Sequence, residues 1–211
     1  SLPSALHAVE RADVLLGDVV LVLGSGPVGL SAVAFSAMRG ARAVLCIGAP
    51  NDRLTAAKQM GASAALNFLT VSERDRNEWV RAQTSGRGAD VTIECTGVPS
   101  AVTEAMRYTR DAGRVVVVGQ YTDHGETAFN PHLDLNKKHL DVRGCWGSDY
   151  SHFHRAVELL RVPQFAQRWS SLRLERYPLS RVNEALEDVA SARTIKALVV
   201  PTASASSFPP P

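Results

Sequence analysis

The residues GDVVLVLGSGPVG, at positions 17–29, place an apolar run directly before the pattern G-x-G-x-x-G. The run at 19–23 predicts a buried strand, and the apolar residues around the last glycine predict a helix. In such a strand–turn–helix the first glycine permits a tight turn, the second lets the backbone approach a pyrophosphate, and the third lets the helix pack closely on the strand. These glycines are Gly24, Gly26 and Gly29. Because a helix N-terminus adds unpaired N–H groups and a partial positive charge, the stretch predicts a dinucleotide-binding turn.

The same alternation of strand and helix continues along the chain. Further strands are expected at residues 43–47, 64–68, 91–95, 115–118 and 140–145. Helices are expected at residues 27–39, 53–60, 72–82, from Pro99 to a break at 111–113, and at 153–160. Short apolar strands that alternate with helices favour a parallel sheet covered by helices. The predicted fold class is therefore α/β, a doubly wound parallel six-stranded Rossmann sheet.

The pattern of expected strands and helices changes after Pro163. A strand at 171–177, a helix at 181–190 and a strand at 196–200 are too few elements for a second domain, so they predict a small C-terminal appendage. The tail at 202–211, rich in Ser, Ala and Pro, is expected to be disordered. The predicted divisions are a leading helix at 1–14, the dinucleotide-binding domain at 15–162, the appendage at 163–201 and the tail.

Charge and apolar patterning exclude several classes of partner. Lys and Arg number 23 against 21 Asp and Glu and form no basic stripe, so nucleic acid is not an expected partner. The longest apolar runs, at 19–23 and 115–118, are far shorter than the ~20 residues of a membrane-spanning helix. A secretory signal is not expected, because no positively charged stretch followed by an apolar segment opens the sequence. Cys46, Cys95 and Cys145 each lie in an apolar segment, which indicates reduced core thiols in a soluble cytoplasmic protein.

The end of the second strand lacks the acidic residue that NAD-preferring folds usually place ~20 residues after the glycines. Gly48 stands there instead, within CIGAPNDR at 46–53. Loss of that carboxylate removes a ribose hydrogen bond and also the repulsion that would exclude a 2′-phosphate. Arg53 can face that phosphate as a cation, or it can merely solvate the helix start beside Asp52. The expected cofactor is therefore NADP or NAD, with a weak lean to NADP.

Two other interpretations of the glycine turn stay open. It can be a ligand-free βα turn, or the S-adenosylmethionine turn of a methyltransferase. The second is disfavoured because the sheet continues as a doubly wound nucleotide fold, without an antiparallel hairpin signal at its end.

Several motifs together resemble the zinc-dependent medium-chain alcohol and polyol dehydrogenases. They are the stretch at 17–29, RL at 53–54 with AKQMGA at 57–62, ECTG at 94–97, the strand at 113–119 and IKA at 195–197. The resemblance spans nearly the whole chain up to Pro201 and is specific to the superfamily, not to a substrate. It implies a cofactor domain inserted in a GroES-like catalytic domain, of which residues 163–201 would be the C-terminal remnant. The N-terminal half, which supplies the family's first zinc ligands, is not in this sequence.

The resemblance assigns cofactor roles to residues at the carboxyl ends of the predicted strands, where open α/β sheets bind ligands. The glycine turn would hold the pyrophosphate, and Gly48 and Arg53 would border the adenosine ribose. Thr96 and Gly97 would lie beside the cofactor, and Gly119 would lie under its nicotinamide half. The expected cofactor-binding residues are Gly24, Ser25, Gly26, Pro27, Val28, Gly29, Gly48, Arg53, Thr96, Gly97 and Gly119. Thr96 can instead be a helix-capping hydroxyl. Trp146 is expected to be buried by packing.

No metal site is expected in this chain. His152 and His154 form a His-x-His pair, but no Cys or acidic ligand recurs at a spacing that would complete a tetrahedral site. His7 is expected at the surface or in the substrate cleft. In the intact family a metal-bound alcohol loses its proton and passes hydride to the nicotinamide. Zinc is therefore expected only in a full-length form, and this chain alone is expected to be inactive, with its catalytic residues unknown.

Three functional hypotheses follow. The leading one is the cofactor-binding part of an NAD(P)-dependent zinc-type dehydrogenase, with a small alcohol or carbonyl compound as substrate. The alternatives are a stand-alone dinucleotide-binding module without catalysis and a zinc-free reductase of the same superfamily. The upstream sequence would decide among them, because Cys and a His-Glu pair mark the metal enzymes.

The sequence also predicts a homodimer joined through an edge strand near residues 132–135. In NPHLDL, at 130–135, Leu133 and Leu135 alternate with polar residues as in a half-buried strand. Pairing with a second copy would satisfy the backbone groups of a bare edge. The alternative is a loop that folds back on its own domain, because the run is short and contains Pro131.

Overall fold

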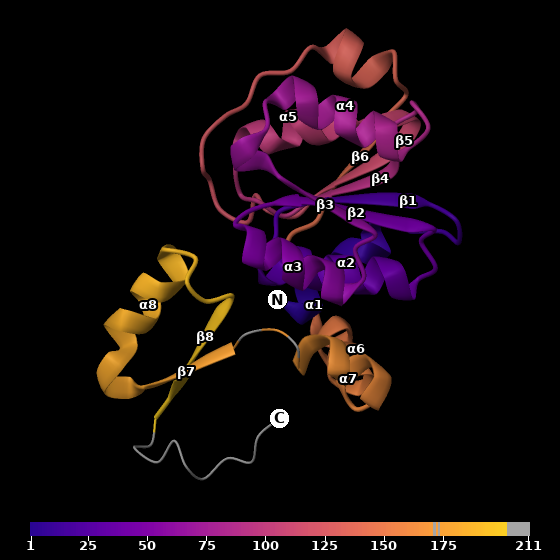
Figure 1. The fold of residues 1–211 in the computed structure, drawn as a ribbon. Coiled ribbons are helices and arrows are strands. Elements are labelled where there is room, and N and C mark those ends of the chain that lie inside the picture. The colour runs from indigo at the N-terminus through magenta and orange to yellow at the C-terminus, as the bar shows by residue number, and fades with distance from the viewer. Residues whose placement is uncertain (171, 173, 202–211) are drawn as a thin grey trace.

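The computed structural model describes residues 1–170, 172 and 174–201, and its centre is a sheet of six parallel strands (Figure 1). The strand order is β3-β2-β1-β4-β5-β6, and each adjacent pair is parallel. The strands are β1 (Val19–Leu23), β2 (Ala43–Gly48), β3 (Ala64–Asn67), β4 (Ala89–Glu94), β5 (Thr109–Val117) and β6 (Asp141–Gly144). The predicted doubly wound Rossmann sheet is confirmed.

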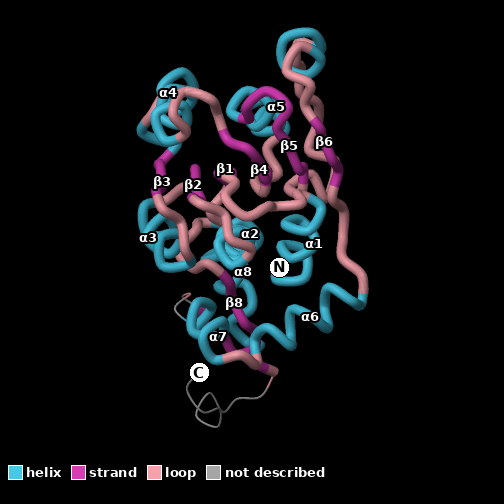
Figure 2. Tube along the Cα trace, turned by 90° about the vertical axis from the view of Figure 1, so that its right-hand side faces the viewer, coloured by secondary structure: helices cyan, strands magenta, loops and turns pink. Residues whose placement is uncertain are grey.

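Two layers of helices cover the sheet (Figure 2). One face carries α1 (Leu2–Arg11), α2 (Pro27–Met38) and α3 (Asn51–Met60), and the other carries α4 (Glu73–Gln83) and α5 (Pro99–Tyr108). Every residue of β1 is buried, with Val20 and Val22 in the core under α1–α3 and Leu21 in the core under α4 and α5. Successive side chains of a strand point to opposite faces, so this continuous apolar run needs a helical layer on each.

The order of the strands reverses between β1 and β4. From β1 the chain proceeds through β2 to β3 at one edge, and from β4 through β5 to β6 at the other. The last residues of β1 and β4, Leu23 and Glu94, lie in register. In open α/β sheets, ligands bind in the crevice outside such a reversal. The glycine turn after β1 and the ECTG segment after β4 therefore meet at this crevice.

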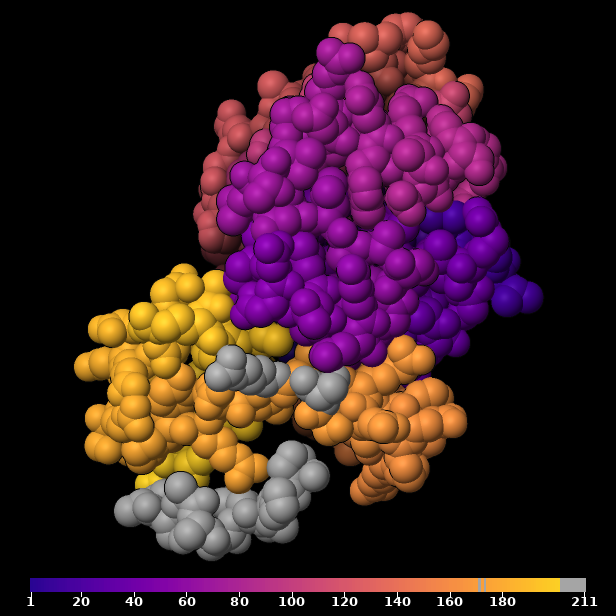
Figure 3. All heavy atoms as spheres, viewed as in Figure 1, coloured from indigo at the N-terminus to yellow at the C-terminus, as the bar shows by residue number. Residues whose placement is uncertain are grey.

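The C-terminal part packs against the helical face that contains α2 and α3. It comprises α6 (Tyr150–Leu160), α7 (Pro163–Ser170), β7 (Leu174–Pro178), α8 (Val182–Ala190) and β8 (Lys196–Val200), and β7 and β8 form a two-stranded parallel sheet. In the space-filling view β7, α8 and β8 form a lobe beside the main body (Figure 3). Trp169 Nε1 donates to Ser31 Oγ over 3.3 Å, and Arg168 Nη1 donates to the Met60 carbonyl over 2.8 Å. The expected strand at 171–177 begins at Leu174 in the described residues, and the expected disordered tail lies outside them.

The edge strand expected near residues 132–135 is wrong, because Pro131–Asn136 is helical. The Asn130 side chain accepts hydrogen bonds from the backbone N–H groups of His132 and Leu133, each over 3.0 Å, and so caps the segment. Asp134 is buried and pairs with Arg107 of α5 at 3.3 Å. These local and tertiary contacts outweigh the alternating pattern, and the segment folds back on its own domain. The edge strands of the sheet are β3 and β6.

Several element boundaries also differ from the sequence expectation, and β5 begins at Thr109 instead of residue 115. Helix α5 ends at Tyr108, before the expected break at 111–113, and the Lys138 ammonium donates to the carbonyl oxygens of Met106 and Thr109 over 2.5 Å each. A cation that binds the last carbonyls of a helix stabilises its end. Helix α6 begins at Tyr150 instead of 153, because Asp149 and His152 form reciprocal capping contacts.

Candidate dinucleotide-binding cleft

The glycine turn has the geometry that the sequence predicted. Gly24 has φ +104°, and a Cβ built on it would lie 2.9 Å from the Cys95 carbonyl oxygen. A Cβ on Gly29 would lie 2.0 Å from the Gly24 carbonyl oxygen, so only glycine permits this contact between helix and strand. A Cβ on Gly26, in contrast, would meet nothing within 4 Å. The space in front of Gly26 is thus open to a ligand, while the other two glycines are required by the fold.

The N-terminus of α2 faces the same space. Gly26 is its N-cap, and within the described chain no side chain caps this end. Pro27 has no N–H to leave unpaired, and the N–H groups of Val28 and Gly29 lie in the first turn, where intrahelical acceptors are lacking. Ser25 fixes the turn to the end of β2 by donating from Oγ to the Ala49 carbonyl over 2.9 Å. This end of α2 can therefore bind an anion.

A cavity of about 440 Å³, here called the glycine-turn cavity, opens beside this turn towards β2, α4 and α5. It brings together the predicted Gly48 and Arg53 with three residues that sequence reasoning missed, Phe68, Arg76 and Glu104. Its lining is Leu23, Gly24, Ser25, Gly26, Ile47, Gly48, Ala49, Arg53, Phe68, Arg76, Cys95, Thr96, Val98, Ser100, Ala101 and Glu104. The outer wall depends on the pairing of α4 with α5, for which the sequence carries no local signal.

Arg53 lies on the wall of this cavity and also contacts the C-terminal part. Its Nη2 donates to the Thr194 carbonyl over 3.0 Å. Its Nε is buried and has no hydrogen-bond partner in the described part of the chain. The guanidinium therefore keeps a donor available beside the end of β2, where Gly48 provides no competing carboxylate.

The far wall of the glycine-turn cavity is a closed polar cluster. Arg76 Nη2 lies 2.9 Å from Glu104 Oε1, and the Tyr108 hydroxyl donates to Glu104 Oε2 over 2.6 Å. Burial, followed by the hydrogen bond to Glu104, raises the pKa of Tyr108 well above its usual range. Because these groups satisfy one another, the cluster presents a neutral polar surface.

A second cavity of about 390 Å³, here called the β5–β6 cavity, lies at the carboxyl ends of β4, β5 and β6. It contains the predicted Thr96, Gly97 and Gly119, and its full lining is Ser4, Val28, Cys95, Thr96, Gly97, Val118, Gly119, Tyr121, Cys145, Trp146 and Gly147. Cys95 and Thr96 line both cavities, so the two adjoin at the end of β4. The combined cleft extends to both sides of the glycine turn.

Trp146 and His7 lie at the border of the β5–β6 cavity. Trp146 is 77% exposed, which makes the expected buried position wrong, and its Nε1 donates to the Tyr121 carbonyl over 2.9 Å. This hydrogen bond holds the indole across the cavity rim. His7 Nδ1 lies 2.9 Å from the carbonyl oxygen of Gly147, so His7 adjoins the cleft.

The hydroxyl of Thr96 makes two internal hydrogen bonds. It donates to Glu94 Oε1 over 2.6 Å and accepts from the Val98 N–H over 3.0 Å. Val98 is the N-cap residue of α5, so the capping alternative is supported in part. The same residue lines both cavities, and its role at the cofactor stays a prediction.

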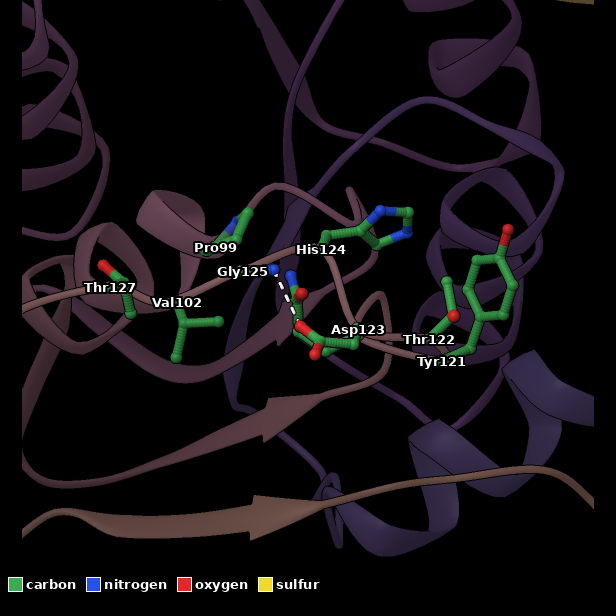
Figure 4. A pocket seen from close by; sticks show the side chains of 9 residues that line it. Pro99, Val102, Tyr121, Thr122, Asp123, His124, Gly125 and Thr127 are labelled. Carbon is green, nitrogen blue, oxygen red and sulfur yellow. Dashed lines mark hydrogen bonds between the residues drawn. The ribbon is translucent and has the colours of Figure 1, made fainter.

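A third cavity of about 450 Å³ lies in the loop after β5 (Figure 4). Val102 and Thr127 lie on one side of it, Tyr121 and Thr122 on the other, and the His124 ring between them. The His124 ring lies 3.8 Å from the Cβ position of Gly97, which places this loop against the β5–β6 cavity.

No group of three or more His, Cys, Asp or Glu side chains in the described residues could hold a metal ion. His152 instead contacts Asp149 at 2.7 Å and Glu10 at 3.4 Å.

Burial raises the pKa of Cys46 to about 12 and also raises the pKa of Cys145. Among the described helices none is long and apolar enough to cross a membrane.

The arrangement agrees with what comparison with known proteins shows. Residues 27–161 match the family described as zinc-binding dehydrogenase. The chain belongs to this family. It is 29% identical over 200 residues to 5-exo-hydroxycamphor dehydrogenase of Pseudomonas putida, covering 94% of this chain and 55% of that enzyme. The solved alcohol dehydrogenase of Thermotoga maritima is 31% identical with a TM-score of 0.88, covering 95% of this chain and 55% of that one.

A second solved structure was determined with a bound nucleotide. A protein from Sinorhizobium meliloti 1021, solved bound to NADP, is 25% identical with a TM-score of 0.79, over 95% of this chain and 57% of that one. The chain spans about half the length of the relatives that it matches. It covers the cofactor-binding part of the medium-chain alcohol dehydrogenase superfamily, and the space in front of Gly26 is open to a ligand.

Proposed function

We propose that the cleft binds a nicotinamide dinucleotide, with the pyrophosphate on the glycine turn. The adenosine would occupy the glycine-turn cavity and the nicotinamide the β5–β6 cavity. The observation that carries this proposal is that Cys95 and Thr96 line both cavities, beside the open face of Gly26. An extended dinucleotide needs two such pockets on either side of an anion site at the strand reversal.

The bound nicotinamide supplies a carbon that accepts or donates hydride. The residues of this chain bind it, orient it and fix the rim around it through Trp146 and Thr96. We propose that the full-length protein is an NAD(P)-dependent, zinc-type dehydrogenase of a small alcohol or carbonyl compound. Residues 163–201 would belong to its substrate-side domain, and the zinc ligands would come from outside these 211 residues. The free, largely buried cysteines support a reducing, cytoplasmic location.

We propose NADP as the preferred cofactor. The available donor of Arg53 and the absence of a carboxylate at Gly48 both favour a 2′-phosphate at this position. The NADP complex of the Sinorhizobium meliloti relative supports the same choice. A dinucleotide-binding module without catalysis remains the second candidate, because the described residues include no metal-ligating group of three.

Calorimetric titration of the chain with NADPH and with NADH tests this function. Gly26→Ala is expected to weaken both cofactors at least tenfold, since the added Cβ enters the space of the pyrophosphate. Gly144→Ala is the matched control, because its Cβ also meets nothing within 4 Å but lies outside the cleft lining. Absence of binding to both cofactors, or equal loss in the two variants, would overturn the assignment. Binding without alcohol-dependent hydride transfer is the expected behaviour of this chain alone.

A further inference from the structure

Glu94, the last residue of β4, carries a fully buried carboxylate at the centre of the cleft. Its Oε1 accepts hydrogen bonds from Thr96 N at 2.6 Å, from Thr96 Oγ1 at 2.6 Å and from Gly97 N at 3.2 Å. Its Oε2 accepts from Gly119 N at 3.1 Å. Each partner is a donor, which is the pattern of an ionised carboxylate. The carboxylate thereby joins the end of β4 to the end of β5.

The donors that surround Glu94 form the wall of the β5–β6 cavity. Thr96, Gly97 and Gly119 all line this cavity, so the carboxylate lies one hydrogen bond behind its surface. A Cβ on Gly119 would lie 2.7 Å from Glu94 Oε1 and 2.4 Å from Gly97 N, which shows how closely the two strand ends approach. The negative charge of Glu94 is thus held at a fixed place beside the proposed nicotinamide site.

No Arg, Lys or His side chain forms an ion pair with Glu94 in the part of the chain that the structure describes. The charge is screened only by N–H and O–H dipoles, and its field extends to the cavity wall. Burial, followed by the charge of Glu94, raises the pKa of Cys95, which lines both cavities. A charge in surroundings of low dielectric constant acts strongly on a second charge nearby.

We propose that Glu94 is a positioning residue that also favours the oxidised form of the bound nicotinamide. This inference rests on the proposed function. The oxidised ring carries one positive charge, and acceptance of a hydride, which is one proton and two electrons, makes it neutral. The carboxylate therefore attracts only the oxidised form. Because the oxidised form is bound more tightly, the reduction potential of the bound couple falls, and the bound reduced cofactor becomes a stronger hydride donor.

A purely structural role for Glu94 predicts a different result. If the carboxylate only holds the two strand ends, its removal weakens the oxidised and reduced cofactors by the same factor. If its charge also acts on the ring, the oxidised form loses more. The ratio of the dissociation constants of the oxidised and reduced forms separates these two roles, whereas the affinity for either form alone does not.

The experiment measures dissociation constants for NADP⁺ and NADPH, and for NAD⁺ and NADH, by calorimetry. Glu94→Gln keeps the size of the side chain and removes its charge, and we expect the oxidised-to-reduced ratio to rise at least threefold. A tenfold rise would correspond to ~30 mV for this two-electron couple. Glu94→Asp keeps the charge, so its ratio should stay near that of the wild type even where both affinities fall.

Glu104→Gln is the matched control. It neutralises a carboxylate in the glycine-turn cavity, away from the proposed nicotinamide site, and is expected to leave the ratio unchanged. Thr96→Val gives a second test that does not depend on the folding of Glu94→Gln. It keeps the Glu94 charge and removes one hydroxyl that screens it, so the ratio should fall at least twofold.

An unchanged ratio in Glu94→Gln, with both forms still bound, would overturn the inference and leave the proposed function intact. So would a ratio in Thr96→Val that is unchanged or raised. Failure of the wild-type chain to bind any of the four nucleotides would instead overturn the proposed function itself.

Discussion

Ser25 and Gly48 compete for one space, because a Cβ built on Gly48 would lie 2.4 Å from Ser25 Oγ and 2.6 Å from its Cβ. Ser25 is held there by two hydrogen bonds to Ala49, donating to its carbonyl at 2.9 Å and accepting from its N–H at 3.1 Å. A side chain at residue 48 therefore displaces part of the glycine turn. A carboxylate at residue 48 therefore requires a change at Ser25, the residue that follows the first glycine of the turn.

Conversion to NAD preference is predicted to need both positions. Gly48→Asp alone should weaken NADH and NADPH together, because the new side chain displaces Ser25. Ser25→Gly combined with Gly48→Asp removes the two side-chain clashes, leaving the backbone N of residue 25 at 3.0 Å, restores a ribose acceptor and repels a 2′-phosphate. The double variant should prefer NADH at least tenfold, or ~1.4 kcal/mol. Calorimetric titration checks this, and a single Gly48→Asp variant that already prefers NADH with undiminished affinity would contradict the coupling.

Arg53 is predicted to select the phosphorylated cofactor. Arg53→Gln removes the cation that lines the glycine-turn cavity, and should weaken NADPH about tenfold while NADH changes less than about twofold. Lys58→Gln removes a charge from an exposed position of the same helix and serves as the control. Titration of both variants with both cofactors checks the prediction. Equal losses of NADPH and NADH in Arg53→Gln would show that Arg53 acts only through its bond to Thr194.

The parts of the fold that the sequence predicted are those fixed by local geometry. The turn at Gly24 needs a positive φ, and its strand and helix are marked by apolar runs on either side. The wall contributed by Arg76 and Glu104 depends on how α4 packs on α5, so no local pattern reveals it. Glu94 lay within a recognised motif, but only the backbone donors around it show what its carboxylate does.

The wrongly predicted edge strand shows how tertiary contacts override alternation. Leu133 and Leu135 follow the period of a strand, yet Asn130 caps the segment and Asp134 binds Arg107. The preference of Asn for helix N-caps, with Pro131 at the first helical position, was a readable signal for a helical start. The ion pair to α5 was not, because it joins residues 27 positions apart.

Asp90, at the other end of β4 from the cleft, is predicted to make stability depend on acid pH. Its carboxylate accepts from Val19 N at 2.7 Å and binds Arg110 Nε at 2.6 Å. Burial alone would raise the pKa of Asp90, but the bond from Val19 and the pair with Arg110 outweigh it and lower the pKa below its usual 3.8. Because the folded-state pKa is depressed, this stabilisation is present above pH ~4 and is lost as the pH falls through the folded value.

Asp90→Asn should therefore lower the free energy of unfolding by about 2 kcal/mol at pH 7, through loss of the charged partner of Arg110. Urea denaturation at pH 7 and at pH 3 measures the difference. The difference in free energy of unfolding between wild type and variant should become smaller at the lower pH, where the wild-type carboxylate begins to protonate. A gap of constant size across this range would show that the charge of Asp90 contributes nothing. Cofactor affinity should stay unchanged, since Asp90 lies outside the cleft lining.

A homodimer stays a prediction, and the structure moves its proposed interface to β6. This strand pairs with β5 on one side only, and its Val142 is 40% exposed. An edge strand with unpaired N–H and C=O groups can pair with the same strand of a second copy about a two-fold axis. Val142→Lys should therefore shift the chain towards monomer in light scattering over a range of concentrations. Leu133→Lys, in the helical segment Pro131–Asn136, is the matched control and should leave the dimer intact. A monomeric wild type, or equal weakening by the two lysines, would rule out pairing through this edge.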